Sequence, residues 1–168
     1  MDSKVLVAEL ADKARLAARS LSTASGAERK AALEAIAQAL ISRKDEILAA
    51  NEIDMNNARA ENMHPQMQDR LLLTADRIKG IAGGARQVAA MPDPLGQTLR
   101  KSTLPNGLEL EQISVPFGVI GMVYEARPNV TVDAAVILLM SGNAALLRGS
   151  STARNSNEIL IRIMRDAL

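Results

Sequence analysis

The sequence predicts an α/β fold in which amino-terminal helices and a β-ribbon precede the first part of a doubly wound, Rossmann-like parallel sheet. Three observations predict it. Apolar residues recur at three- and four-residue spacing through residues 1–95, as on one face of a helix. The period changes to two over 96–116. Short apolar runs then alternate with helical segments over 117–168, which favours parallel strands with right-handed crossovers.

Four helices are predicted in the first region. The first covers residues 5–21, and the second starts at Ser25, where Ser-Gly-Ala-Glu fits the capping box. A third, around 47–55, is polar enough to lie on the surface, and Thr74 begins the fourth. Pro92-Asp93-Pro94-Leu95-Gly96 ends it. The predicted buried positions are Leu6, Leu10, Ala14, Ala17 and Leu21 in the first helix, Leu33, Ile36, Ala37 and Leu40 in the second, and Ile78, Ile81, Ala82, Ala85, Val88 and Ala89 in the fourth.

A β-ribbon is predicted next, because residues 98–104 and 108–115 flank Pro105-Asn106-Gly107 and Asn-Gly is a strong hairpin signal. The apolar run 118–123 is typical of a strand covered on both faces. A helix over 129–141 follows, with Gly142 just past its end. A second apolar run at 144–147 and a last amphipathic helix complete the alternation.

Composition excludes several classes of partner and chemistry. Twenty Lys and Arg against nineteen Asp and Glu give a net charge of +1, too little to attract nucleic acid or an anionic membrane. No apolar run reaches the roughly 18 residues of a membrane span, and the start of the chain lacks a leader pattern, so we expect a cytoplasmic protein. With no cysteine and one histidine, the chain offers no disulfide, metal site or thiol nucleophile.

Two loops are candidate binding sites, because ligands of open parallel sheets bind beyond the carboxyl ends of the strands. In the second loop, Arg148, Gly149, Ser150 and Ser151 present amides, hydroxyls and a guanidinium, which suit the phosphate of a nucleotide. The alternative is an ordinary helix cap. Neither common glycine-rich nucleotide fingerprint is present.

In the first loop, Glu125, Arg127 and Asn129 follow the first predicted strand of the sheet, and three polar side chains at a strand end suggest a site. The alternative is that Asn129 or Thr131 caps the next helix while Glu125 and Arg127 pair on the surface. Pro128 disfavours a helical conformation at Arg127 in either case.

The run from Val115 to Ser151, which includes Tyr-Glu-Ala-Arg-Pro-Asn-Val-Thr at 124–131, resembles the glutamate-5-semialdehyde dehydrogenase (gamma-glutamyl phosphate reductase) family of the aldehyde dehydrogenase superfamily. Residues 69–74 and 86–94 are also similar, so the resemblance covers nearly the whole chain. It implies an aldehyde-dehydrogenase-like fold. It also implies NADPH-dependent reduction of L-glutamate 5-phosphate to the semialdehyde in proline biosynthesis, through acyl transfer to a cysteine.

The resemblance also implies roles for the loop residues. Asn129 is expected to be catalytic by stabilising an oxyanion, Glu125 and Arg127 to bind the small-molecule substrate, and Arg148, Gly149, Ser150 and Ser151 to bind NADPH. Residues 117–168 would be an incomplete NADPH-binding domain, and the ribbon would serve oligomerisation or interdomain contact in a homo-oligomer.

Members of that family are more than twice as long and contain a catalytic cysteine, which this chain lacks. We therefore expect the amino-terminal part of a longer enzyme, inactive by itself. The alternative is a non-catalytic interaction fragment that pairs through its β-ribbon.

Overall fold

The computed structural model describes residues 3–168, and its elements follow the predicted order, with the two short helices α4 and η1 in addition. They are α1 (Ser3–Thr23), α2 (Gly26–Ser42), α3 (Lys44–Ala60), α4 (Pro65–Leu71), α5 (Ala75–Ala90), β1 (Thr98–Thr103), β2 (Glu109–Ile113), β3 (Val119–Val123), α6 (Pro128–Met140), β4 (Ala144–Arg148), the short 3₁₀ helix η1 (Ser151–Ala153) and α7 (Arg154–Asp166).

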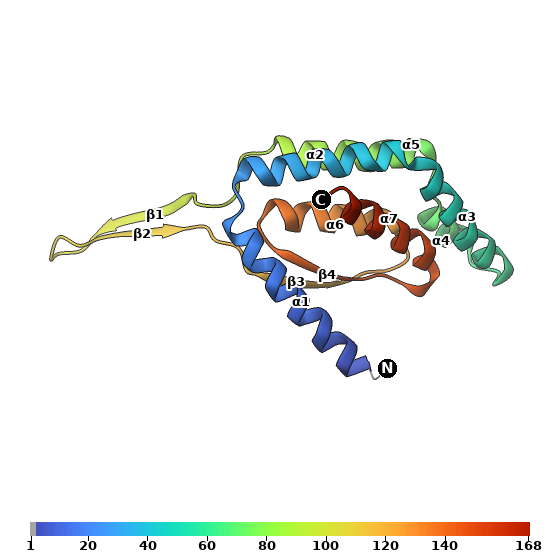
Figure 1. Cartoon of the computed structure of the whole chain (residues 1–168), viewed down its shortest axis with the longest axis horizontal. Helices are drawn as coiled ribbons and strands as arrows, with labels where there is room; N and C mark the ends of the chain where they lie inside the picture. The colour runs from blue at the N-terminus through green and yellow to red at the C-terminus, as the bar shows by residue number, and fades with distance from the viewer. Residues whose placement is uncertain (1–2) are drawn as a thin grey trace.

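The body is layered. Helices α2 and α5 lie side by side, α6 and α7 form the next layer, and strands β3 and β4 follow beneath them, with α1 crossing on the other side of the strands (Figure 1). The main core fills the space between α2, α5, α6 and α7. It confirms the stripes predicted for the second and fourth helices; its most deeply buried members are Leu33, Ile36, Leu40, Ile78, Val132, Val136, Leu160 and Ile163.

The predicted caps are present. Ser25 Oγ accepts from Glu28 N–H at 3.2 Å, and Glu28 Oε2 accepts from Ser25 N–H at 2.7 Å, which completes the capping box. Thr74 Oγ1 accepts from the N–H of Arg77 at 3.2 Å. These bonds satisfy amide groups that have no partner within a helix.

Two helical expectations need correction. In α1 the buried positions are Ala14 and Ala18. Of the other predicted positions, Leu21 is partly buried, whereas Leu6, Leu10 and Ala17 are exposed, because the apolar contacts of α1 with β3 and β4 come from its carboxyl-terminal half. In α3 the prediction of a surface helix is wrong on one face, where polar residues are buried in a hydrogen-bond network described below.

Helix α4 was not predicted, because seven residues are too few to show a period. Pro65 stands in its first turn, and Nδ1 of His64 accepts a hydrogen bond from Gln66 N–H at 3.3 Å. His64 is solvent-exposed, as its polar surroundings in the sequence suggest. Together with the segment that leads to α5, this helix forms one wall of the candidate site.

The predicted ribbon is an antiparallel hairpin of β1 and β2 that projects from the body (Figure 1). Gly107 in its turn has a φ of +86°, a conformation that side chains disfavour. Almost every residue of the two strands is exposed, including Leu99 in β1 and Leu110 in β2, and so is Leu108 just before β2.

Strands β3 and β4 pair in parallel, with Val119 opposite Ala144 and Val123 opposite Arg148, as predicted. Helix α6 connects them and ends before Gly142, whose φ is +72°. The prediction that β3 is covered on both faces is wrong for its second half, where the residues are exposed and Val123 is 82% exposed. Because the strands are parallel, the loops after residues 123 and 148 meet at one edge, where the N–H of Tyr124 donates to the carbonyl of Arg148 at 3.1 Å.

Within the described residues, no helix is long and apolar enough to cross a membrane.

Candidate functional site

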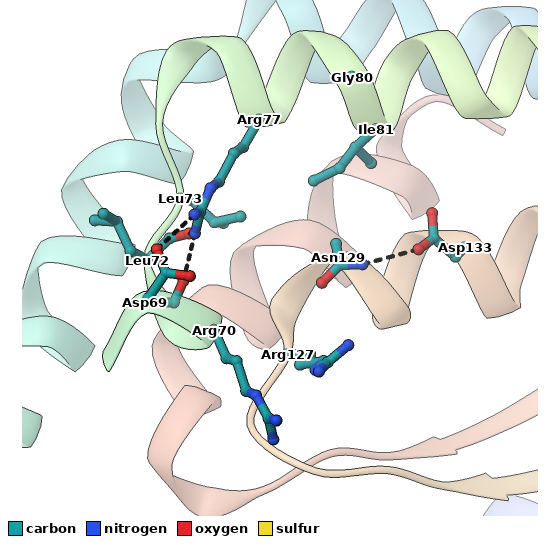
Figure 2. A pocket seen from close by; sticks show the side chains of 10 residues that line it. All are labelled: Asp69, Arg70, Leu72, Leu73, Arg77, Gly80, Ile81, Arg127, Asn129 and Asp133. Atoms are coloured by element: carbon teal, nitrogen blue, oxygen red, sulfur yellow. Dashed lines mark hydrogen bonds and ion pairs between the residues drawn. The ribbon is translucent and has the colours of Figure 1, made fainter. Parts of the chain in front are cut away.

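A hollow of about 490 Å³ lies between α5, the start of α6 and the segment that joins α4 to α5 (Figure 2). Its lining combines charged, polar and apolar side chains. Its lining residues are Asp69, Arg70, Leu72, Leu73, Arg77, Gly80, Ile81, Arg127, Asn129 and Asp133. Two of the predicted site residues, Arg127 and Asn129, therefore belong to one hollow.

The start of α6 presents these two side chains because neither is used as a cap. Arg127 stands before the helix in an extended conformation, with φ −132° and ψ 94°, and Pro128 begins the first turn. Asn129 Nδ2 donates to Asp133 Oδ2 at 3.0 Å, four residues further along the same face. The alternative in which Asn129 or Thr131 caps the helix is thus wrong, since Thr131 instead shares a 2.7 Å hydrogen bond with the hydroxyl of Tyr124.

Two guanidinium groups share one carboxylate at the edge of the hollow. Arg127 Nε and Arg70 Nη1 each lie 3.5 Å from Glu125 Oε1, so the surface pairing of Glu125 with Arg127 is present, and Arg70 joins it. Arg127 Nε is buried and forms no hydrogen bond with any residue that the structure describes. One carboxylate between two guanidiniums leaves one positive charge unbalanced here.

The third guanidinium in the lining, that of Arg77, already has an ion-pair partner and hydrogen-bond acceptors. Arg77 Nη2 pairs with Asp69 Oδ1 at 2.7 Å, and its Nη1 donates to the carbonyls of Asp69 and of Leu72, the latter at 2.8 Å (Figure 2). These bonds hold the segment after α4 against the first turn of α5. Arg77 therefore shapes the wall of the hollow.

Asp133 is half-buried, and desolvation raises the pKa of its carboxyl, an effect that the hydrogen bond from Asn129 partly offsets. Among residues 3–168, this amide is its recorded partner, and no cation forms an ion pair with it. A half-buried carboxylate without a counter-charge beside a hollow is a candidate ligand-binding group.

The second predicted loop lies beside a different hollow. Ser150 Oγ accepts from the N–H of Thr152 at 3.2 Å and caps η1, as in the alternative reading of this loop. Arg148, which donates to the carbonyl of Gly149, and Ser151 are exposed to solvent. The adjoining hollow, of about 410 Å³, is lined by Tyr124, Leu147, Gly149, Asn157, Glu158, Ile161, Arg162, Arg165 and Asp166.

Gly149 is required for packing. A Cβ at this position would lie 2.3 Å from Asn157 Nδ2 and 3.0 Å from the ring of Tyr124. Asn157 Oδ1 also accepts from the hydroxyl of Thr131 at 2.8 Å, so the turn after β4 is packed against a chain of hydrogen bonds that reaches α6.

Sequence reasoning missed Arg70, Arg77 and Asp133. Asp133 had a usable signal, because four-residue spacing from Asn129 places both side chains on one face of the predicted helix. Arg70 had none, since it lies on α4, a helix that the sequence pattern did not reveal. Arg77 lies on a predicted helix, but its place in the lining depends on how α5 packs against α6. In the part of the chain that the structure describes, no cluster of three His, Cys, Asp or Glu residues could hold a metal ion.

Comparison with known proteins gives consistent matches. The model of the Aldehyde dehydrogenase family matches residues 2–168. A gamma-glutamyl phosphate reductase from Thermotoga maritima is 39% identical with a TM-score of 0.92, over 95% of this chain and 39% of that one. A gamma-glutamyl phosphate reductase from Saccharomyces cerevisiae is 31% identical with a TM-score of 0.90, over 95% and 40%.

More distant structures share the fold. An NAD-dependent benzaldehyde dehydrogenase from Corynebacterium glutamicum is 20% identical with a TM-score of 0.72, over 93% of this chain and 32% of that one. The chain spans about 40% of the length of the two reductases that it matches.

Proposed function

The chain belongs to the aldehyde dehydrogenase family, and we propose that it is part of an enzyme that reduces L-glutamate 5-phosphate to L-glutamate 5-semialdehyde and phosphate with NADPH, a step of proline biosynthesis. The main support is its similarity to two gamma-glutamyl phosphate reductases over 95% of its length. The fold agrees with the aldehyde-dehydrogenase-like architecture that the residues of the 115–151 run imply.

In this proposal the first loop serves the substrate. Glu125 and Arg127 bind it, and the amide of Asn129 stabilises the oxyanion that forms at the reacting carbonyl. An amide nitrogen has two N–H donors. One of those of Asn129 is used by Asp133, which leaves the second for the carbonyl oxygen.

The second loop serves the cofactor. The exposed guanidinium of Arg148 and the exposed hydroxyl of Ser151 stand at the carboxyl edge of the parallel strands, where ligands of open sheets bind. These groups suit the phosphate and ribose of NADPH, which supplies the hydride for the reduction. Gly149 and Ser150 hold the turn that presents them.

The chain contributes only part of the active site. Acyl transfer needs a nucleophile, and the sequence contains no cysteine, so the thiol comes from another segment of the enzyme. We propose that these 168 residues by themselves neither reduce the acyl phosphate nor bind NADPH tightly. We further propose that the enzyme is cytoplasmic and homo-oligomeric.

The test is an assay of NADPH oxidation by the complete enzyme with L-glutamate 5-phosphate and, for comparison, acetyl phosphate. We expect a clear preference for the glutamyl substrate. Reduction of acetyl phosphate alone would refute the proposed substrate.

A second candidate function is a non-catalytic interaction module. It is favoured by the projecting hairpin, whose exposed Leu99, Leu108 and Leu110 could pair with another chain. Sedimentation of the 168-residue chain with and without these leucines replaced by serine would detect such pairing. If the chain self-associates through the hairpin and the complete protein lacks reductase activity, the interaction module replaces the reductase as the proposed function.

A further inference from the structure

We propose that the hollow between α5 and α6 recognises the amino-acid head of the substrate, with Arg127 and Arg70 binding the α-carboxylate and Asp133 binding the α-ammonium group. This inference rests on the proposed reductase function and adds to it the groups that distinguish a glutamyl compound from other acyl phosphates.

The positive side of the hollow has more guanidinium groups than carboxylates, so it can bind the carboxylate of a ligand. Arg77 is matched by Asp69 at 2.7 Å, whereas Arg70 and Arg127 share Glu125 at 3.5 Å each. Contacts of 3.5 Å are long for an ion pair with hydrogen bonds, which is usually close to 2.8 Å. A ligand carboxylate could therefore bind both guanidiniums in the planar geometry that arginine favours.

The buried nitrogen of Arg127 supports this assignment. Its Nε forms no hydrogen bond in the described structure, although the atom is shielded from solvent. The nearby Glu125 Oε1 lies 3.5 Å away, longer than a normal hydrogen bond, and a buried donor left without a hydrogen bond costs about 1–3 kcal/mol. An oxygen of a bound carboxylate would supply the missing acceptor, and the positive end of the α6 dipole favours an anion at this place.

The carboxylate of Asp133, on the negative side of the hollow, lacks a positive partner in the same way. Asp133 lines the same hollow, is half-buried and takes its hydrogen bond from the neutral amide of Asn129. Burial without a cation raises the pKa of its carboxyl, so the folded protein holds an ionised group there at a cost in stability. An ammonium group of the ligand would provide the counter-charge.

The spacing of these groups suits one small molecule. Asn129 and Asp133 are four residues apart on α6, roughly 6 Å along the helix axis, and Arg127 stands just before them at the start of α6. The volume of about 490 Å³ lies within the range of small-molecule sites. Leu73 and Ile81 line the hollow and provide an apolar wall for the methylene groups of a glutamyl chain.

The test uses the complete enzyme in the oxidative direction, where an aldehyde, inorganic phosphate and NADP⁺ give the acyl phosphate and NADPH. The C–H bond of the aldehyde breaks as its hydrogen leaves as hydride to NADP⁺, a phosphate oxygen forms the new bond to the acyl carbon, and one proton is released to solvent. Three aldehydes are compared: L-glutamate 5-semialdehyde, 5-oxopentanoate, which lacks the ammonium group, and 4-aminobutanal, which lacks the α-carboxylate.

Each variant should lose recognition of the substrate group that the replaced side chain binds. Asp133→Asn should lower kcat/KM for the semialdehyde at least about tenfold, the effect of one charge-assisted bond, and leave that for 5-oxopentanoate nearly unchanged. Arg127→Gln should lower kcat/KM for the two aldehydes that carry a carboxylate, the semialdehyde and 5-oxopentanoate, and leave kcat/KM for 4-aminobutanal nearly unchanged. Asp76→Asn and Arg86→Gln, exposed positions on α5 outside the hollow, are the matched controls.

A folding defect is recognisable, because it would lower all three rates together with the thermal midpoint. Removal of the charge of Asp133 should instead raise the midpoint of the unliganded enzyme at neutral pH, since burial disfavours the ionised form. Equal losses for all three aldehydes with an unchanged midpoint would overturn the inference and leave the reductase function intact. A wild-type enzyme that oxidises none of the three would refute the proposed function itself.

Discussion

The carboxylate of Asp54 on α3 accepts hydrogen bonds from the backbone N–H and the hydroxyl of Ser156 on α7, at 2.8 and 2.6 Å. Asn155 donates two more, at 3.1 and 2.8 Å. Nearby, Asn51 Nδ2 donates to the carbonyl of Leu71 at 2.9 Å and to Ser156 Oγ at 3.0 Å. This buried network fixes the start of α7 to α3 and to the segment that follows Arg70.

Replacement of Asp54 by alanine should destabilise the chain by about 3 kcal/mol, because at least two buried donors lose their acceptor at about 1–3 kcal/mol each. Urea denaturation followed by circular dichroism measures this change. The control is Asp12→Ala on α1, whose side chain is 73% exposed, and it should shift stability by less than about 0.5 kcal/mol. Equal effects of the two variants would show that the network contributes little.

The buried residues of α3 also show where prediction from sequence stops. Asn51 and Asp54 stand in a polar stretch, and nothing in that stretch indicates that their partners come from residues 71–73 and 155–156. Capping motifs were predictable, because Ser25 and Glu28 act within one turn of each other. The parallel strands were predictable because apolar runs alternate with amphipathic helices.

Only the part of the candidate site that depends on local sequence was predictable. Arg127 and Asn129 lie in a loop at the end of a predicted strand, and local sequence places them there. Arg70 reaches the site only because the fold brings it within 3.5 Å of Glu125 in the loop before α6, a contact between distant parts of the chain. Glu125 and Arg148 were located by the same strand-end rule, yet neither is among the residues that line the two hollows.

Gly26 should not tolerate a side chain. A Cβ there would lie 2.1 Å from Asp93 Oδ2, and Asp93 is held by two hydrogen bonds from Arg29 at 2.8 and 2.7 Å. Gly26→Ala should lower the free energy of unfolding by about 1–3 kcal/mol, as overpacking usually does. Gly83→Ala on α5 meets no atom within 4 Å and should raise it by up to about 1 kcal/mol, since alanine favours helix. An unchanged free energy of unfolding for Gly26→Ala would mean that Asp93 moves aside without loss of stability.

Asp93 should also contribute to acid sensitivity. The hydrogen bond from Leu95 N–H and, after it, those from Arg29 lower the pKa of this carboxyl in the folded state. The unfolded chain therefore binds more protons near pH 4, and the contribution of Asp93 to stability is lost as the pH falls through its folded pKa. Denaturation curves from about pH 6 to 2 should show a steeper loss in the wild type than in Asp93→Asn. Parallel curves would contradict this role.

Arg148 should set the choice of cofactor in the complete enzyme. A charge-assisted bond to the ribose 2′-phosphate is worth about 1.5–3 kcal/mol, so Arg148→Ala should weaken NADPH binding about tenfold to a hundredfold and NADH binding less. Fluorescence titration measures both affinities. Arg154→Ala, an exposed arginine at the start of α7 that pairs with Glu158, is the control. Equal losses for the two cofactors would assign Arg148 a structural role.

The central claim is that the hollow lined by Arg127, Asn129 and Asp133 belongs to the substrate site of a glutamyl phosphate reductase. A crystal structure of the complete enzyme with L-glutamate at saturating concentration tests it most directly. The account predicts the ligand in this hollow, with its α-carboxylate bonded to Arg127 and its α-ammonium group to Asp133. Density for L-glutamate at another place, with this hollow filled by water alone, would contradict it.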